Sequence, residues 1–274
     1  MTLQPSIDDL VVIGFGAMAS AIVEGAIRAG VLDPRRTLAA DPSPERRAHA
    51  DRLGVRAFER ASEALREAEE ARVMLAVKPQ MLADVAHECA EVCKGRRVVS
   101  ILAGATIATV GEAFAAQRVV RVMPNTPARV GKGISAIATA SGGTKDDVGF
   151  ARNLFAAVGE VVEISEGLMD AFTAVCGSGP AYLFYLAEAM TKAAREVGFD
   201  DATADRIVRA TVVGSAALLD ADRSRSAGEL RALVTSKGGT TAAATESLDE
   251  SGVMDAFVRA IVAARDRGRE LGGG

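Results

Sequence analysis

The sequence predicts an α/β protein, with an N-terminal doubly wound parallel sheet followed by an all-α domain. Strand-like and helix-like segments alternate from residue 10 to about residue 164, the order expected of parallel strands joined by crossover helices. A glycine-rich turn follows the first strand at once. After Ile164 no convincing strand remains, and Ala-rich helical segments take over. These three observations predict a first domain at residues 1–164 and a second at residues 165–274.

Eight short apolar runs are the expected strands of the first domain. The run from Val73 to Val77 is apolar throughout, as expected of a central strand buried on both faces. Expected helices between strands include Pro44–Leu53 and Thr106–Phe114. The expected strands are Leu10–Ile13, Thr37–Ala40, Val55–Phe58, Val73–Val77, Val98–Ile101, Val119–Met123, Ile134–Ala138 and Val161–Ile164.

The second domain is expected to be a set of Ala-rich helices that cannot cover themselves. Ser226 to Glu229 reads as a capping box at one helix start. Because the helices carry few charges over much of their circumference, we expect a partner subunit to complete their burial. The expected helices are Leu168–Val175, Pro180–Val197, Ala202–Ala221, Gly228–Val234, Thr240–Leu248 and Val253–Leu271.

Composition excludes several classes of protein. The chain has 274 residues, 49% of them hydrophobic, and a net charge of −4 with both signs interspersed, so nothing indicates a nucleic-acid surface. No apolar run approaches the ~20 residues of a membrane span, and the polar stretch Met1–Asp9 does not resemble a signal peptide. Three cysteines, an odd number, argue against a disulfide framework and for a cytoplasmic protein. Cys89 and Cys93 lack the second pair that a metal site would need, so buried thiols and no metal are expected.

The turn after the first strand fits the dinucleotide fingerprint of Rossmann-type domains. Gly14-Phe15-Gly16-Ala17-Met18-Ala19 is the G-x-G-x-x-A variant, placed between a strand and a helix that runs to about Arg28. Gly14 would make the tight turn and Gly16 would let the backbone approach a pyrophosphate. The second strand ends in Asp41, where ribose hydroxyls are usually held. The alternative is a glycine-rich turn that binds nothing.

Two further loops follow the carboxyl ends of expected strands, where ligands bind in such sheets. Val73–Val77 runs into Lys78-Pro79, and Val119–Met123 runs into Pro124-Asn125-Thr126-Pro127. Asn125 offers both a donor and an acceptor to a ligand. The alternatives are a rigid turn at the two prolines and a solvated charge at Lys78.

A second glycine pair, in Thr235-Ser236-Lys237-Gly238-Gly239-Thr240-Thr241, precedes an expected helix. Hydroxyls and free N–H groups at a helix start favour a small carboxylate, although a plain helix–helix turn with a Thr cap has the same composition.

The histidines, His49 and His87, both fall on expected helices of the first domain, away from strand ends. Reduction of a ketone usually needs an acid, often a histidine, to protonate the developing alkoxide. Reduction of an iminium carbon removes a positive charge and needs no such acid at the moment of hydride transfer.

The motifs together resemble the pyrroline-5-carboxylate reductase family over nearly the whole chain. They are Ile13–Met18, Ala76-Val77-Lys78-Pro79, Arg121-Val122-Met123-Pro124-Asn125-Thr126-Pro127, Gly177-Ser178-Gly179-Pro180-Ala181-Tyr182 and Val234–Thr241. The resemblance implies a Rossmann domain, a helical dimerisation domain, and homodimers that can assemble into decamers. It also implies reduction of 1-pyrroline-5-carboxylate to L-proline with NADPH or NADH, the last step of proline biosynthesis.

Site roles follow from the resemblance, position by position. Thr241 would hydrogen-bond the ring nitrogen, while Ser236, Gly238, Gly239 and Thr240 would hold the carboxylate. By the resemblance the coenzyme would lie against Ile13, Gly14, Phe15, Gly16, Ala17, Met18, Ala76, Val77, Lys78, Pro79 and Asn125. The place of Asp41 and Ser43 after the second strand adds these two residues to the expected coenzyme site.

Three positions depart from the family pattern. Lys237 stands where many members have Pro, and Ser224 stands where some have Glu near the substrate pocket. Asp41-Pro42-Ser43 replaces a more basic or hydroxyl-bearing pattern of members that bind a 2′-phosphate. A carboxylate there favours a free ribose diol, yet Ser43, Arg46 and Arg47 could still serve NADPH, so the coenzyme preference stays open.

Two other functions are compatible with this scaffold. A β-hydroxyacid dehydrogenase would carry a catalytic Lys four residues after Gly179, where this chain has Leu183. A non-catalytic coenzyme sensor would keep Gly14 and Gly16 but would have no reason to keep the glycines and hydroxyls of Gly238–Thr241 at a helix start.

Overall fold

The computed structural model describes residues 9–139 and 143–272. They form two compact units, one comprising the chain up to Ser178 together with the residues from Ala264 onward, and the other comprising Gly179–Ala263. The N-terminal segment expected not to be a signal peptide lies almost wholly outside the described residues. We call the two parts the sheet unit and the helical unit.

The sheet unit contains one eight-stranded sheet of order β3-β2-β1-β4-β5-β6-β7-β8. All eight expected strands are present, with their ends displaced by at most two residues. Their bounds are β1 (Leu10–Ile13), β2 (Thr37–Ala40), β3 (Arg56–Phe58), β4 (Arg72–Leu75), β5 (Arg97–Ser100), β6 (Arg118–Met123), β7 (Gly133–Thr139) and β8 (Gly159–Glu163). Register pairs Leu10 of β1 with Thr37 on one side and with Arg72 on the other.

The sheet is parallel as predicted except at one strand. β7 pairs with β6 in antiparallel register, Val122 opposite Ile137, while every other pairing is parallel. The reason is the connection, which holds only the short 3₁₀ helix η3 (Thr126–Val130). A parallel return needs a crossover of a dozen or more residues, so a shorter link reverses the strand.

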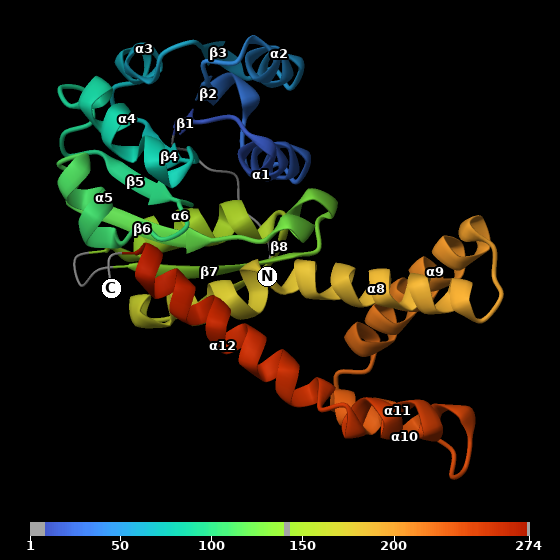
Figure 1. The fold of residues 1–274 in the computed structure, drawn as a ribbon. Coiled ribbons are helices and arrows are strands. Elements are labelled where there is room, and N and C mark those ends of the chain that lie inside the picture. Colours follow the sequence, from blue (N-terminus) through green and yellow to red (C-terminus); the bar gives the residue numbers. More distant parts are fainter. Residues whose placement is uncertain (1–8, 140–142, 273–274) are drawn as a thin grey trace. The chain divides into compact units, whose positions relative to one another are not determined.

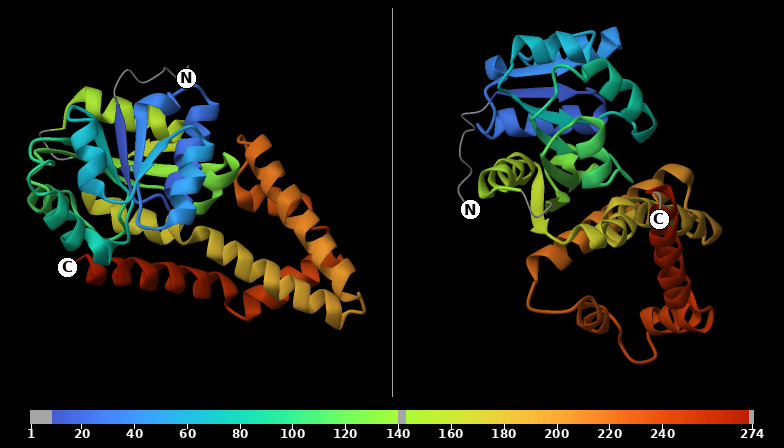
Figure 2. Two further views of the ribbon diagram at one scale, coloured as in Figure 1. Left: turned by 90° about the horizontal axis from the view of Figure 1, so that it is seen from above. Right: turned by 90° about the vertical axis from the view of Figure 1, so that its left-hand side faces the viewer.

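Helices cover both faces of this sheet (Figures 1 and 2). On one face lie α1 (Ala17–Arg28), α2 (Pro44–Arg52) and α6 (Lys145–Ala156). On the other lie α3 (Ala61–Glu67), α4 (Leu82–Cys89), α5 (Ile107–Ala113) and α7 (Met169–Phe172). Because successive strand residues point to opposite faces, Val11 and Val73 enter one core while Val12 and Met74 enter the other.

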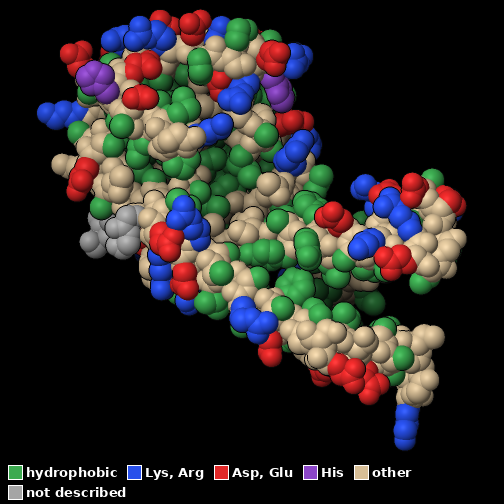
Figure 3. All heavy atoms as spheres, viewed as in Figure 1, with side chains coloured by type: hydrophobic (Ala, Val, Ile, Leu, Met, Phe, Trp, Pro, Cys, Tyr) green, Lys and Arg blue, Asp and Glu red, His purple; other side chains and the backbone are tan. Residues whose placement is uncertain are grey.

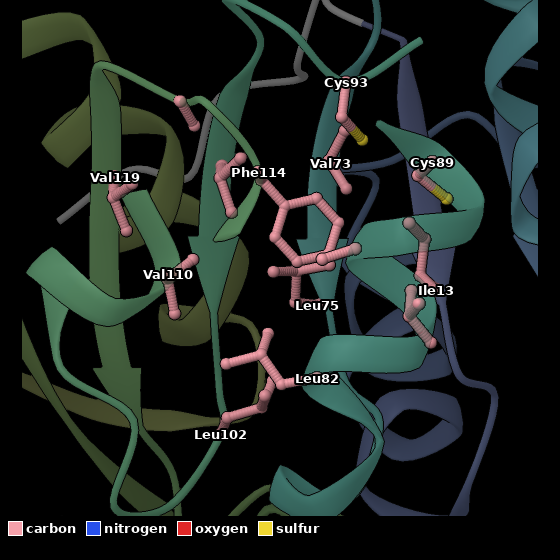
Figure 4. Packing of buried hydrophobic residues seen from close by; sticks show 14 of the residues in the cluster. Ile13, Val73, Leu75, Leu82, Cys89, Cys93, Leu102, Val110, Phe114 and Val119 are labelled. Atoms are coloured by element: carbon pink, nitrogen blue, oxygen red, sulfur yellow. The ribbon is translucent and has the colours of Figure 1, made fainter. Parts of the chain in front are cut away.

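The core under α4 and α5 is dense and apolar. Figure 4 shows the Phe114 ring beside Val73 and Leu75 of β4. Cys89 and Cys93 lie in this cluster with no exposed surface, as buried thiols were expected to do. The hydrogen bond with the Cys93 thiol and then burial raise the pKa of Cys89, so the thiol form is favoured there.

A change of helix type marks the end of the sheet unit. α7 leads into a π-helix at Thr173–Gly177, in which the Ser178 N–H donates to Thr173 O at 2.8 Å. The helix α8 (Gly179–Glu196) follows directly. The expected helix Leu168–Val175 is therefore present in part as a wider turn, a form often found at functional sites.

The helical unit contains α8, α9 (Asp201–Ala221), α10 (Ala227–Leu233), α11 (Thr240–Glu250) and the first part of α12 (Val253–Leu271). The last turns of α12 belong to the sheet unit, where a Cβ on Gly268 would come 3.4 Å from that of Asp170. The compact units divide at Ser178, whereas the predicted domain boundary follows the end of the last strand. That boundary at residue 165 stays a prediction.

Burial differs sharply in the helical unit. Among its described residues only Ala204 and Val208 are buried, while Phe184 and Tyr185 are 70% and 72% exposed. Figure 3 shows hydrophobic side chains open at the surface of these helices. None of the helices described here is both long enough and apolar enough to span a bilayer.

Candidate coenzyme and substrate sites

The glycine-rich turn closes tightly over the ends of three strands. Gly14 has φ +89°, and a Cβ there would lie 2.8 Å from the carbonyl oxygen of Ala76. Its N–H donates to Ala40 O at 2.8 Å. Both the backbone angle and the close approach require glycine at this position.

The start of α1 is open to a ligand. Gly16 is its N-cap, no side chain caps it, and its first turn holds no acidic residue. At the place where a Cβ would stand on Gly16, the nearest atom beyond its chain neighbours is Nη1 of Arg46 at 4.0 Å. A cavity of about 650 Å³ opens here, lined in part by Phe15, Ala17 and His49. The unpaired N–H groups fit a pyrophosphate, so the residues present fit a dinucleotide coenzyme.

Most other helices in the described parts of the chain carry their own negative charge at the start. Only α1, α5, α8 and α11 have no acid in the first turn. α5 receives one from elsewhere, because Ile107 N–H donates to Glu166 Oε1 at 2.7 Å. α8 continues from the π-helix and so has no free start. That leaves α1 and α11, one in each unit.

Asp41 lies beside the turn, but its carboxylate is already engaged. Only 2% of the residue is exposed. Oδ2 accepts from Phe15 N–H at 2.8 Å, and Oδ1 accepts from Ser43 N–H at 2.9 Å. The sequence placed Asp41 correctly at the end of β2 but did not show that its acceptors serve the chain itself.

The loop after β4 lies against the glycine turn. Ala76 N–H donates to Ile13 O at 2.8 Å, and Val77 Cγ1 stands 3.0 Å from where a Cβ on Gly14 would be. Lys78 is exposed and precedes the 3₁₀ helix η2 (Pro79–Met81). The structure therefore brings the expected coenzyme residues of β1, β2 and β4 together.

Asn125 is also committed to the backbone. Its Nδ2 donates to Cys176 O at 3.1 Å, and its Oδ1 accepts from Ile134 N–H at 2.9 Å. The side chain is buried and ties the loop after β6 to the π-helix. Both partners are distant in sequence, so no local signal could have identified them. The amide is thus placed to fix the shape of this loop.

The second glycine pair forms the start of α11. Gly238 has φ +70°, and Gly239 is the N-cap with no side-chain cap. A Cβ on Gly239 would come 2.3 Å from Ser236 Oγ, so this hydroxyl lies directly over the helix start. Within the described chain, the side chains of Ser236, Thr240 and Thr241 make no hydrogen bond. Three hydroxyls and the first N–H groups of α11 are therefore available together.

Two positions that depart from the family pattern, Lys237 and Ser224, also lie in the helical unit. Lys237 is exposed and forms no ion pair with any described residue. Ser224 donates from Oγ to Asp222 Oδ1 at 2.7 Å in the turn before α10. Lys237 adds a positive charge beside the start of α11, and Ser224 serves its own turn.

Acid–base and metal chemistry have little support in the described residues. They contain no group of His, Cys, Asp and Glu suited to a metal ion. His49 lies on α2 with its ring edge-on to Phe15, 6.0 Å between centroids, and His87 lies on α4. Both histidines are on helices, as expected.

Comparison with known proteins extends over the whole chain. Residues 166–271 match the family model for pyrroline-5-carboxylate reductase dimerisation, and residues 9–104 match that for NADP oxidoreductase, coenzyme F420-dependent. Pyrroline-5-carboxylate reductase of Methanosarcina acetivorans is 38% identical over 95% of this chain and 96% of its own. That of Corynebacterium melassecola is also 38% identical, over 96% and 98%. The structure of the Coxiella burnetii enzyme has a TM-score of 0.87 and 31% identity, covering 97% of this chain and 99% of its own.

The coenzyme turn on a doubly wound sheet, followed by a helical domain, defines a Rossmann-type oxidoreductase that uses a nicotinamide coenzyme. Within that class, the relatives that match nearly the full length of this chain are pyrroline-5-carboxylate reductases. The chain belongs to the pyrroline-5-carboxylate reductase family.

Proposed function

We propose that this protein reduces 1-pyrroline-5-carboxylate to L-proline with NADPH or NADH. The observation that carries the proposal is the start of α11, where an uncapped helix N-terminus meets three unbonded hydroxyls. The relatives that match along the full chain are named for this substrate. A small carboxylate on a cyclic imine fits such a start because its charge suits both the N–H groups and the helix dipole.

Binding of the substrate carboxylate is assigned to the backbone N–H groups of Thr240 and Thr241, with Ser236 Oγ above them. Gly238 and Gly239 allow the chain to turn there without a side chain over the donors. The exposed ammonium of Lys237 adds attraction for an anion at long range. Together these groups would fix the acid end of the substrate and leave the ring free to be oriented.

The remaining step is orientation and charge removal. Thr241 is the residue assigned to hydrogen-bond the ring nitrogen. Ile13–Met18 and the Ala76–Pro79 loop would hold the coenzyme, which would supply the hydride when bound. As the C–H bond forms, the C=N π pair returns to nitrogen and the iminium charge is lost, so no side chain has to deliver a proton in that step. This agrees with a site that has hydroxyls but no histidine.

Assembly and location belong to the same proposal. The apolar surface of the helical unit and the match to a dimerisation model support a homodimer, which could assemble further to a decamer. A cytoplasmic location follows from the reducing environment that three free cysteines favour. A sedimentation experiment on the full chain measures the assembly directly.

The test is an assay of the purified chain with 1-pyrroline-5-carboxylate and each reduced coenzyme. We expect the absorbance of the reduced nicotinamide to fall and L-proline to form in equal amount. Failure to form proline with either coenzyme, at substrate well above the usual KM range, would refute the proposal. Oxidation of a 3-hydroxy acid would instead favour the dehydrogenase alternative, which Leu183, 54% exposed and unable to transfer a proton, argues against.

A further inference from the structure

The carboxylate of Asp41 contacts three donor groups of its own chain. Besides the N–H groups of Phe15 and Ser43, Oδ2 meets Nη1 of Arg46 at 3.2 Å. The side chain is buried with 2% exposed. A ribose diol would need a carboxylate that faces the ligand with free acceptor positions. Here the carboxylate instead joins the glycine turn to the start of α2.

Arg46 and Arg47 are neighbours in sequence with different commitments. Arg47 donates from Nη1 to the carbonyl oxygens of Asp41 and Pro42, at 2.9 and 2.8 Å, and its Nη2 lies 3.4 Å from Glu59. It holds the β2–α2 turn together. Arg46 donates one N–H to Asp41, and its side chain is 53% exposed. A guanidinium has five donors, so most of those on Arg46 remain open.

The open donors of Arg46 lie beside the coenzyme turn. Its Nη1 is the nearest atom to the Cβ position of Gly16, at 4.0 Å, and the residue lines the cavity at the start of α1. Ser43 is the N-cap of α2, and its hydroxyl makes no cap bond. Pro44 has no N–H, but the N–H groups of Glu45 and Arg46 begin the helix. A hydroxyl, a guanidinium and a helix start together fit a phosphate.

We infer that Arg46, with Ser43, binds the 2′-phosphate of NADPH and sets the coenzyme preference, while Asp41 is a positioning residue that shapes the glycine turn through Phe15. This rests on the proposed function only in that the coenzyme is a reduced nicotinamide dinucleotide. The negative charge of Asp41 does not oppose a phosphate strongly because Arg46 already pairs with it. The chain therefore prefers NADPH to NADH.

The experiment measures binding of each reduced coenzyme without any imine present, by the change in fluorescence of the nicotinamide. The chain has no Trp, so the nucleotide signal is free of energy transfer from indole. The variants are Arg46→Met, Arg46→Lys and Asp41→Asn. Arg52→Met is the matched control, because it removes the same charge from the last turn of the same helix.

Arg46→Met should weaken NADPH binding by about 10- to 100-fold, the loss expected for a charge-assisted hydrogen bond, and NADH binding by less than about twofold. Arg46→Lys should bind NADPH more tightly than Arg46→Met does, because lysine keeps the positive charge but lacks the paired N–H donors of the guanidinium group. Arg52→Met should leave both affinities unchanged. Equal binding of NADPH and NADH by the unaltered protein, or equal losses for both in Arg46→Met, would overturn the assignment of Arg46.

Asp41→Asn separates a positioning role from a ribose contact. If Asp41 shapes the turn, both coenzymes lose affinity at a temperature well below unfolding. If Asp41 holds the ribose, NADH binding falls while NADPH binding stays the same or tightens, and that result would contradict the inference. A fall in thermal stability with both affinities intact would reduce Asp41 to a stabilising residue and would also contradict it. None of these titrations needs the imine, so they stand even if no proline is formed.

Discussion

The sheet unit and the helical unit bury their apolar side chains in opposite ways. The sheet has a core on each face, and large residues such as Phe15, Phe114 and Phe155 have at most 1% of their surface exposed. In the helical unit Phe184 and Tyr185 are open to solvent. Burial of a large side chain is worth about 1.5–3 kcal/mol. The described helical unit therefore gains much less stabilisation from apolar burial than the sheet unit, which agrees with the proposed homodimer.

The same contrast holds for two capping boxes. In the sheet unit Thr144 caps α6, and Asp147, which is 2% exposed, also accepts from Arg72 and Arg118 at 2.7 and 2.8 Å. Burial alone would raise the pKa of Asp147, but the bonds from Thr144 and the two arginines outweigh it and lower that pKa to about 2. In the helical unit Ser226 and Glu229 form the same box in an exposed position. The same capping motif is thus buried in one unit and exposed in the other.

The largest expected effect is on assembly. Phe184→Glu places a charge on the apolar face of α8, which we propose to be buried in the dimer. The dissociation constant of the dimer should rise by roughly 100-fold or more, because an unpaired buried charge costs several kcal/mol. Sedimentation velocity over a range of concentrations measures it.

The control for this variant is a substitution of the same kind in the sheet unit. Val130, in η3, is 76% exposed, close to the exposure of Phe184. Val130→Glu should leave the assembly unchanged. If both variants dissociate alike, or if neither does, the apolar surface of the helical unit is not the dimer contact.

The next effect concerns the two open helix starts. Thr241→Val keeps the shape of the side chain and removes the hydroxyl at α11, so turnover should fall by about 10- to 1,000-fold while coenzyme binding at α1 stays nearly unchanged. Ser236→Ala should cost less turnover and raise KM for the imine. Steady-state kinetics with a coenzyme titration separates the two. Turnover of Thr241→Val within about twofold of the unaltered protein would remove this hydroxyl from the reaction.

Asp147→Asn should destabilise the sheet unit by up to about 3 kcal/mol, because it takes one carboxylate partner from the buried Arg72, which also pairs with Asp146, and one from Arg118. The pKa of about 2 in the folded protein lies below the ordinary aspartate value of 3.8. The stabilisation is therefore complete above the unfolded pKa and is lost as the pH falls toward 2, an amount of about 2 kcal/mol. Urea unfolding at several pH values should show the difference between the two proteins narrowing from pH 5 downward. A constant difference over that range would contradict the pairing.

The smallest expected effect is Glu229→Gln in the exposed box of the helical unit. The pKa of Glu229 is lowered by hydrogen bonds from the backbone and the side chain of Ser226. Solvent screens this charge, and Gln can still accept the same bonds. The urea midpoint should change far less than for Asp147→Asn. A loss as large as that of Asp147→Asn would mean that this box is buried by a partner subunit.

The order of elements could be predicted from the sequence because it depends on local pattern. Alternating apolar runs and cap residues predicted all eight strands and the α-helices of the second domain. The glycine turn could be predicted too, since Gly14 and Gly16 are needed by their own backbone geometry. The direction of β7 was missed, although the short connection after Met123, with only a 3₁₀ turn, carries the signal.

Side-chain commitments in the candidate site could not be predicted. Asp41 reaches back 26 residues to Phe15, and Asn125 reaches forward 51 residues to Cys176. Such bonds depend on which loops the sheet brings together, and a residue type alone does not choose between its own chain and a ligand. The roles of the site residues therefore remain proposals, while their placement at strand ends and helix starts agrees with expectation.

One consequence of α12 concerns the order in which the chain can fold during synthesis. Its last turns pack in the sheet unit, where a Cβ on Gly104 would stand 3.6 Å from the carbonyl oxygen of Leu271. A ribosome releases these residues after the whole helical unit. The sheet can form early, but the loop at Gly104 and the helix start at Asp170 lack this cover until α12 itself has been made. A nascent chain halted after α11 should thus be more open to protease near Gly104 than the finished protein.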